Sequence, residues 1–281
     1  MRILRYAAFS SDPDGGNPAG VVLDATGVSD ADMLAAAADV GYSETAFLIP
    51  HGPAELEARY FSPLAEVPFC GHATIAAAVA YAEVNGAGPL RLTTRAGLIE
   101  VTVTADEDNV LTATLTSVAT RSADIDDDDR TALLAALRWS ADEVDPRFPV
   151  RAAYAGAWHP VVAAATRDRL ADLDYDYPAL AELMAARDWM TIELVWRESD
   201  AVFHARNPFP PGGVVEDPVT GTAAAAFGGY LRELGLVELP AAVTIHQGED
   251  MGRPGVITVS VPSEPGSGIA VTGTAVPIPT A

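Results

Sequence analysis

Two stretches of this sequence place polar side chains immediately before an alanine-rich segment. Residues 66–73 read Glu-Val-Pro-Phe-Cys-Gly-His-Ala, and residues 216–223 read Glu-Asp-Pro-Val-Thr-Gly-Thr-Ala. We expect a helix to begin at the glycine of each stretch, where the first N–H groups lack intrahelical partners and carry partial positive charge. Gly71 and Gly221 are therefore candidates to hold a substrate carboxylate or a developing enolate. The alternative is that both glycines only permit close packing of a helix on a sheet.

Three side chains in or near these stretches could move a proton. Glu44 stands directly before an apolar, strand-like run, where a carboxylate partly removed from water is suited to acid–base work; it could also be an ordinary surface group. His72 follows Gly71 and could take part in proton transfer; alternatively, its imidazole only makes structural hydrogen bonds. Asp217 precedes a proline and could also transfer a proton; alternatively, it only stabilises a turn or caps a helix. Thr222 replaces His72 in the second stretch, as expected if one shared site needs different groups on its two sides.

The lysine and cysteine content of the chain limits the kinds of catalysis that it can perform. All 17 basic residues are arginine, so a lysine Schiff base, and with it the usual pyridoxal phosphate route to racemisation, is excluded within this chain. Cys70 is the single cysteine, which excludes an internal disulfide and a multi-thiolate metal site in one chain. The spacing of histidine, cysteine and acidic residues indicates no metal site, so we expect neither a metal nor a cofactor.

The two stretches belong to an internal repeat. They share the pattern E-x-P-φ-x-G-x-A at an offset of 150 residues, and residues 95–103 and 253–261 further along share R-x-G-φ-I-x-V-x-V. Two matching blocks in the same order indicate duplication of a β-rich half. Because each alanine-rich segment is apolar nearly all round, we expect its helix to be buried within a sheet.

The predicted fold class is α+β, with two pseudo-symmetric barrel-like halves, each wrapped around a central helix. The first half is expected to cover residues 1–119, completed by a strand within 270–281, and the second half residues 120–269. The aspartate-rich segment 120–129 is interpreted as the linker. Predicted strands cover residues 3–9, 20–23, 45–49, 56–61, 90–94, 98–103, 110–116, 150–154, 158–165, 191–196, 201–205, 243–246, 256–261 and 269–276, and predicted helices cover 30–39 with Ser29 as N-cap, 74–84, 129–137, 178–187 and 224–234.

Composition excludes several classes of protein. A chain of 281 residues with 49% hydrophobic content can bury a core and is not disordered. Its net charge of −22 repels phosphate backbones, so we expect no nucleic-acid partner. No apolar run approaches the roughly 18 residues of a membrane span, and the first residues lack the basic and apolar regions of a secretory signal. We therefore expect a cytoplasmic protein with no membrane partner.

Several stretches together resemble the PhzF-like family of phenazine biosynthesis. Besides the two repeated stretches, they are Asp14–Val22, Tyr42–Phe47, Arg59–Pro63 and Gln247–Pro254, in the family's order over nearly the whole chain. The resemblance implies the diaminopimelate-epimerase fold, in which two barrels each close around a central helix and the active site lies between them. It also implies a homodimer and a small-molecule carboxylate substrate.

The resemblance further implies roles for individual residues. Glu44 corresponds to the acid/base glutamate that moves a proton between carbons of the substrate, and His72 and Asp217 to polar residues that bind substrate and handle protons. Thr222 stands where the family commonly has serine, and its extra methyl group narrows the pocket. The remaining lining groups are the hydroxyl of Ser43 and the backbone N–H groups of Gly71 and Gly221.

We therefore expect a cofactor-independent isomerase or epimerase acting on a small carboxylate-bearing metabolite. Two alternatives stay open: a one-base amino-acid racemase that uses Cys70, and a small-acid binding protein without chemistry. The related epimerases and proline racemases use two facing cysteines, and because Thr220 takes the place of the second one here, a two-thiol mechanism lacks one of its bases. The sequence does not name the substrate or decide between isomerisation and epimerisation.

Overall fold

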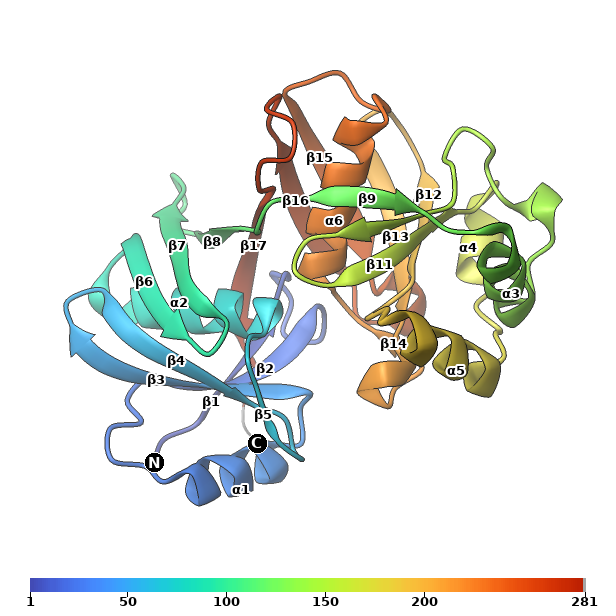
Figure 1. Ribbon diagram of the computed structural model, residues 1–281. Helices are drawn as coiled ribbons and strands as arrows, with labels where there is room; N and C mark the ends of the chain where they lie inside the picture. Colours follow the sequence, from blue (N-terminus) through green and yellow to red (C-terminus); the bar gives the residue numbers. More distant parts are fainter. Residues whose placement is uncertain (280–281) are drawn as a thin grey trace. The chain divides into compact units, whose positions relative to one another are not determined.

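The computed structural model describes residues 1–279 and divides into two compact units. Unit 1 comprises Met1–Thr116 and the segment that begins at Thr272, and unit 2 comprises Ser117–Val271. In each unit a curved sheet surrounds one helix (Figure 1), which confirms the predicted α+β fold class. The last two residues of the strand expected within 270–281 lie outside the described residues.

Unit 1 is a closed barrel of eight strands. Around the barrel the order is β1, β2, β3, β4, β6, β7, β8 and β17, and β17 pairs with β1 to close it. The β2–β3 and β4–β6 pairs are parallel, and a two-residue strand, β5 (Glu66–Val67), pairs antiparallel with the end of β4. The barrel strands are β1 (Leu4–Ala8), β2 (Asn17–Val22), β3 (Glu44–Gly52), β4 (Glu55–Phe61), β6 (Gly88–Thr94), β7 (Gly97–Ala105), β8 (Leu111–Thr116) and β17 (Ala270–Pro277).

Helix α2 (Gly71–Asn85) runs through this barrel and contacts β1, β2, β3, β7 and β8. Its residues from His72 to Ala80 are all buried, because alanine side chains are small enough for strands to approach the helix on every side. Helix α1 (Asp30–Val40) lies outside the barrel and packs Met33 against Phe47 and Phe61. The predicted N-cap is confirmed, since the Ser29 side chain accepts a hydrogen bond from the backbone N–H of Asp32.

Unit 2 repeats this plan with different strands. Its sheet order is β9, β10, β11, β12, β13, β15 and β16, and the β11–β12 and β13–β15 pairs are parallel. The two-residue strand β14 (Glu216–Asp217) pairs antiparallel with the end of β13, as β5 does with β4. The other strands are β9 (Arg121–Asp124), β10 (Arg151–Tyr154), β11 (Trp158–Ala163), β12 (Glu193–Arg197), β13 (Val202–Pro208), β15 (Ala241–Gln247) and β16 (Gly255–Val261). The matching order of parallel and antiparallel pairs agrees with the duplication inferred from the repeat.

Helix α6 (Gly221–Glu233) is the central helix of unit 2 and contacts β9, β10, β11, β12 and β16. The residue before β9 approaches it so closely that a methyl group on Gly229 would lie 2.5 Å from the side chain of Thr120, which explains a glycine in the middle of a helix. The outer helices α3 (Asp127–Leu137) and α5 (Tyr177–Arg187) pack Leu133 and Met184 into one apolar cluster with strand residues of this unit. The short helices of unit 2 are α4 (Arg167–Ala171), η1 (Ala141–Glu143), η2 (Pro210–Gly212) and η3 (Glu249–Met251).

The expectation of a linker at residues 120–129 is wrong. Arg121–Asp124 forms β9, which pairs antiparallel with β10, and Asp126 caps α3. The polar composition of β9 suits a strand at the sheet surface, where Arg151 of β10 bonds to Ser122 and Asp124. Cross-strand pairing therefore overrides the turn-like composition. Among the described residues, no helix is long and apolar enough to cross a membrane.

Candidate functional site

Glu44 is the first residue of β3, at an end of the unit 1 barrel. Helix α1 ends at Gly41, whose left-handed backbone conformation (φ 70°) turns the chain into β3. Because β3 runs parallel to β2, with Glu44 opposite Ala19, the starts of both strands lie at the same barrel end. The structure thus places the predicted acid/base glutamate at a strand mouth, with its side chain 20% exposed.

The Glu44 carboxylate meets the side chains of Cys70 and His72. Its Oε2 atom lies 3.5 Å from the Cys70 thiol, which donates to it, and 3.5 Å from His72 Nε2. Cys70 Sγ also lies 3.3 Å from His72 Nδ1. Cys70 is the N-cap residue of α2 and His72 is in its first turn, so the start of the central helix brings two groups to the carboxylate. His72 is 7% exposed.

Two further residues contact the His72 ring from other elements. Ser43 Oγ lies 3.4 Å from Nε2, and Asn17 Nδ2 lies 3.3 Å from Nδ1. Asn17 is buried at the start of β2, directly after Gly16, whose φ of 56° and close approach to Ala8 require glycine. Asn17 lies in the Asp14–Val22 stretch that carries part of the family resemblance, but it was not predicted as a site residue. A buried amide 55 residues away from its partner leaves no signal in the local pattern.

Gly71 begins α2 without the tight packing that was its alternative explanation. A methyl group built on Gly71 meets no heavy atom within 4 Å. The side chain of the N-cap residue Cys70 makes no capping hydrogen bond to the first turn, which leaves the N–H groups at this end suited to an anion.

Unit 2 gathers the second set of predicted residues around the start of α6. Asp217 Oδ2 accepts a hydrogen bond of 2.6 Å from the Thr220 hydroxyl. Gln247, 2% exposed at the end of β15, accepts from the Thr220 N–H at 3.1 Å and donates to the Asp217 carbonyl at 2.9 Å. Gly221 and Thr222 follow as the first two residues of α6, and both are half-buried. Gln247 was noted in the sequence only as part of a glycine-containing stretch, so its role in holding this loop was missed.

In each repeated stretch, an arginine makes a bidentate interaction with the carboxylate of the first glutamate. Arg59 donates to both oxygens of Glu66, at 2.9 and 2.8 Å, and Arg206 donates in the same way to Glu216. Such paired bonds fix the geometry of both partners. The two short strands that lead to Cys70 and to Asp217 are therefore held to β4 and β13 by equivalent contacts.

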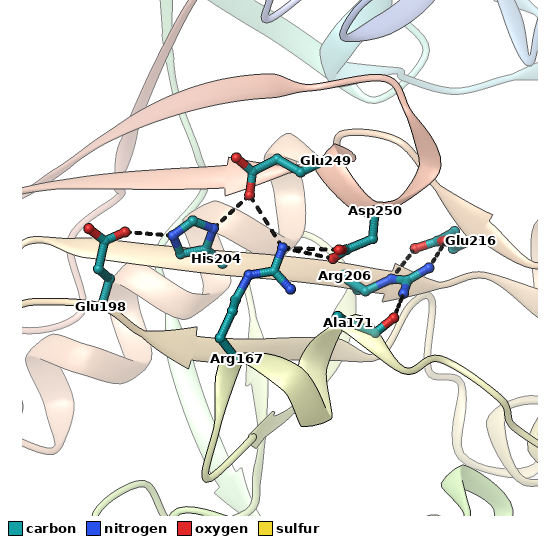
Figure 2. A network of polar contacts seen from close by, with 8 residues as sticks. All are labelled: Arg167, Ala171, Glu198, His204, Arg206, Glu216, Glu249 and Asp250. Atoms are coloured by element: carbon teal, nitrogen blue, oxygen red, sulfur yellow. Dashed lines mark hydrogen bonds and ion pairs between the residues drawn. The ribbon is translucent and has the colours of Figure 1, made fainter.

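Figure 2 shows polar contacts of unit 2, in which Arg206 bonds to Glu216 and Ala171 and a second group gathers around His204 and Arg167. His204 lies between Glu198 and Glu249, at 2.6 and 2.7 Å. Arg167 reaches Asp250 at 3.0 Å and Glu249 at 3.6 Å. Because Glu249 and Asp250 follow Gln247 within three residues, these bonds hold the loop next to the glutamine that contacts Asp217 and Thr220.

Behind Asp217 lies a buried chain of hydrogen bonds. Asn207, opposite Asp217 in the β13–β14 pair, donates to Glu193 Oε2 and accepts from the Thr191 hydroxyl, each at 2.6 Å. Since the single Thr191 proton goes to Asn207, His159 Nδ1 donates to Thr191 over 2.8 Å. Burial raises the pKa of Glu193 to about 8, partly offset by the Asn207 bond, and lowers the pKa of His159 to about 3. Both groups are therefore held neutral near pH 7.

The two units differ at the place of Glu44. Arg59 and Arg206 occupy equivalent positions, so their strand partners, Phe47 and Leu194, are also equivalent. Three residues before these partners stand Glu44 in unit 1 and Thr191 in unit 2. The carboxylate at the strand mouth is thus a property of unit 1, whereas unit 2 has the hydroxyl of a buried network.

Glu44, Cys70 and His72 also form a cluster that could hold a metal ion. Each offers one ligand atom, and the three atoms lie within 4.8 Å of one another. The sequence indicated no metal site because Glu44 is 26 residues from Cys70, a separation that fits no local ligand spacing. Only the fold brings the three side chains together.

The comparisons with known proteins agree with this arrangement. The sequence pattern of the family described as phenazine biosynthesis-like protein matches residues 6–281. The uncharacterised isomerase YfhB of Bacillus subtilis is 32% identical, over 98% of this chain and 95% of that protein. The trans-2,3-dihydro-3-hydroxyanthranilate isomerase of Pseudomonas fluorescens is 30% identical, over 89% of this chain and 86% of that protein.

Solved structures agree with the fold. A phenazine biosynthesis protein of the PhzF family from Bacillus anthracis superimposes with a TM-score of 0.89 at 25% identity, covering 99% of this chain and 98% of the other. A probable proline racemase from Agrobacterium radiobacter has a TM-score of 0.66 at 15% identity, covering 98% and 90%. The latter likeness concerns the fold alone.

Proposed function

The chain belongs to the phenazine biosynthesis-like family, and we propose that it is a cofactor-independent isomerase or epimerase that shifts a proton on a small carboxylate-bearing metabolite. The observation that carries this proposal is the position of the Glu44 carboxylate, half-buried at a strand mouth and in contact with the Cys70 thiol and the His72 imidazole. Isomerase activity is also the function named for relatives that cover nearly the whole chain.

Glu44 acts as the general base and then as the general acid. Its carboxylate takes a proton from a substrate carbon and becomes a carboxylic acid, while the electrons of the broken C–H bond delocalise into an enolate. Glu44 then returns a proton to a carbon of the substrate, and its carboxylic acid can exchange that proton with water before the return, so that charge and atoms balance without a co-reactant. His72, with its ring in contact with Glu44, Ser43 and Asn17, holds the carboxylate in position.

The start of each central helix is suited to a negatively charged group. Neither N-cap side chain, Cys70 or Thr220, makes a capping hydrogen bond to a backbone N–H of its helix, so N–H groups there are suited to a carboxylate or an enolate oxygen. Asp217 is instead bonded to the Thr220 hydroxyl, in a position to exchange protons with a bound group. We infer from the family resemblance that Asp217 and Thr222 take part in binding the substrate.

Proton exchange tests the proposal directly. The protein is incubated in deuterated water with amino acids, hydroxy acids and dihydro-hydroxyanthranilate-like acids, and the products are analysed by mass and NMR spectrometry. Wild type should introduce deuterium into one compound, and Glu44→Gln should lower the exchange rate by about 10²- to 10⁴-fold. The matched control is Glu57→Gln, which alters a glutamate on the same barrel that also lies 3.5 Å from a histidine, His51, but is exposed. Unchanged exchange in Glu44→Gln would refute the proposed base.

A one-base racemase with Cys70 is the second candidate, favoured by the 3.5 Å contact of its thiol with Glu44. In that reaction the thiolate removes the proton and Glu44 has only a supporting role. Cys70→Ser then loses exchange while Glu44→Gln keeps a measurable part of it. The opposite ranking of the two variants supports Glu44 as the base.

We also propose, from the family resemblance, that the protein is a cytoplasmic homodimer. Light scattering on the purified full chain measures the mass of the particle, and a single species near the 29.3 kDa of one chain would contradict the dimer.

A further inference from the structure

We propose that Glu44, Cys70 and His72 form a binding site for Zn²⁺ or a similarly soft divalent cation, and that its occupation inhibits the enzyme. Binding of the ion follows from the geometry alone. Inhibition rests in addition on the proposed function, because the ion would occupy the carboxylate that moves the proton.

The three ligand atoms are spaced as on one face of a tetrahedral zinc site. Glu44 Oε2 lies 3.5 Å from Cys70 Sγ and 3.5 Å from His72 Nε2, and Sγ lies 3.9 Å from Nε2. Zinc bonds of about 2.3 Å to sulfur and about 2.0–2.2 Å to nitrogen and oxygen place ligands roughly 3.3–3.6 Å apart at tetrahedral angles. Only the Sγ–Nε2 distance has to shorten, by a few tenths of an ångström, for the three atoms to bind one ion.

The types of the ligands select the ion. A thiolate, an imidazole and a carboxylate together suit zinc and other borderline or soft ions, whereas Mg²⁺ and Ca²⁺ prefer oxygen ligands alone. Three protein ligands also leave a fourth position for water or for a substrate group. The cluster can be reached from solvent, since the Glu44 side chain is 20% exposed and Cys70 is half-buried.

Asn17 supplies the outer contact that a metal-binding histidine needs. A metal on His72 Nε2 requires the proton on Nδ1, and Nδ1 lies 3.3 Å from the Asn17 side-chain amide. A 180° flip of the amide exchanges its nitrogen and oxygen, which have nearly the same size, and lets the oxygen accept a hydrogen bond from Nδ1–H. Such outer partners fix the ring and typically change metal affinity by about 10- to 100-fold.

Cobalt provides a readout that does not depend on activity. The Cys70 thiol of the full chain is kept reduced with a phosphine while Co²⁺ is added. The near-ultraviolet charge-transfer band of a cobalt–thiolate bond is recorded, and Zn²⁺ is then added to displace the Co²⁺. We expect one ion per chain, a thiolate band in wild type and its loss in Cys70→Ser. His72→Gln and Glu44→Gln should weaken Zn²⁺ binding by at least about 100-fold, and Asn17→Ala by about tenfold.

Matched controls separate this site from other histidines and carboxylates. His51→Ala removes an exposed histidine that lies 3.5 Å from Glu57, and we expect it to bind Zn²⁺ as wild type does. Thermal unfolding with and without Zn²⁺ checks that each variant is folded and measures ligand stabilisation independently. A titration without a thiolate band, or equal affinity in wild type and Cys70→Ser, overturns the site.

Inhibition is measured separately. With the substrate found by deuterium exchange, Zn²⁺ should abolish exchange and a chelator should restore it fully. Zinc binding without inhibition would overturn the inhibitory part and leave the site in place. Loss of the proposed enzyme activity in every assay would leave the cobalt titration unaffected, so that the two proposals fail independently.

Discussion

At the residue scale, unit 2 carries two ionisable side chains into its interior without opposite charges beside them. Glu193 is 1% exposed and His159 is fully buried, and among the described residues Glu193 Oε1 and His159 Nε2 have no hydrogen-bond partner. Buried groups of this kind are kept neutral because ionisation would cost several kcal/mol. Their place behind Asp217, through Asn207, links the neutrality of the network to the candidate site.

Glu193 gives the stability of the protein a defined pH dependence. Native Glu193 keeps its proton up to about pH 8, whereas the unfolded chain loses it near 4.5. The native state therefore binds more protons between these values, and the contribution of Glu193 to stability falls as the pH rises through that window. His159 acts oppositely, since stability is lost as the pH falls from 6.5 towards 3.

The variant Glu193→Gln tests the pH dependence of stability that is due to Glu193. The variant keeps an oxygen for the Asn207 bond but cannot ionise, so its free energy of unfolding minus that of wild type should increase from pH 5 to pH 8, by up to about 4 kcal/mol. Urea denaturation at pH 5, 6.5 and 8 measures this difference. Glu57→Gln, at an exposed glutamate, should show none. A difference that stays constant with pH would mean that Glu193 is not protonated in the native state.

At the element scale, the strands β5 and β14 have two residues each, and in both of them the glutamate is paired with an arginine of the neighbouring strand. In unit 2 the Arg206–Glu216 pair is almost completely buried, with side chains 9% and 8% exposed. Removing one partner of a buried pair leaves an uncompensated charge, which is far more costly than losing a surface pair. This pair, through Glu216, sets the start of the chain that presents Asp217.

Glu216→Gln should therefore lower the free energy of unfolding by about 3 kcal/mol. Glu55→Gln is the matched control, because Glu55 pairs with Arg91 at 3.5 Å but both side chains are more than half exposed; it should cost about 0.5 kcal/mol or less. Urea denaturation compares the two variants. Replacing both Arg206 and Glu216 by methionine should recover part of the loss, and equal costs for the two single variants would argue against the ion pair as the anchor.

At the scale of the whole molecule, the chain returns to its beginning in order to finish the first barrel. Strand β17 pairs with β1, with Tyr6 opposite Pro277 and Ala8 opposite Ala275, and with β8 on its other side. Further bonds join Phe9 N–H to the Thr274 carbonyl and Ile278 N–H to the Arg5 carbonyl. Without β17, the edges of β1 and β8 in unit 1 would be exposed.

Deleting residues 272–281 should open unit 1 while leaving the strand order of unit 2 intact. Hydrogen exchange followed by mass spectrometry should show loss of amide protection in β1 and β8, because their partner is gone. Peptides from the β15–β16 pair serve as the internal control and should stay protected. Retained protection in β1 would show that the barrel does not depend on its last strand.

Much of the fold could be predicted because it depends on patterns within short segments. The repeated E-x-P-φ-x-G-x-A stretches predicted two similar halves, and the apolar, alanine-rich segments after Gly71 and Gly221 predicted two buried helices, as the structure has them. Ser29 as N-cap of α1 was also readable from the sequence. Strand β9 was not, because its four residues, three of them polar, form a strand only through pairing with β10.

The sequence by itself determined which residues could do chemistry: Glu44, His72 and Asp217, whose catalytic roles stay predictions. Only the tertiary structure decided their surroundings: Asn17 and Cys70 against His72, Gln247 against Thr220 and Asp217, and a buried network beside Asp217. The physical reason is one of range. Helical and strand periodicity act between neighbours in the chain, whereas a hydrogen bond, an ion pair or a metal site joins atoms whose positions depend on the packing of separate elements.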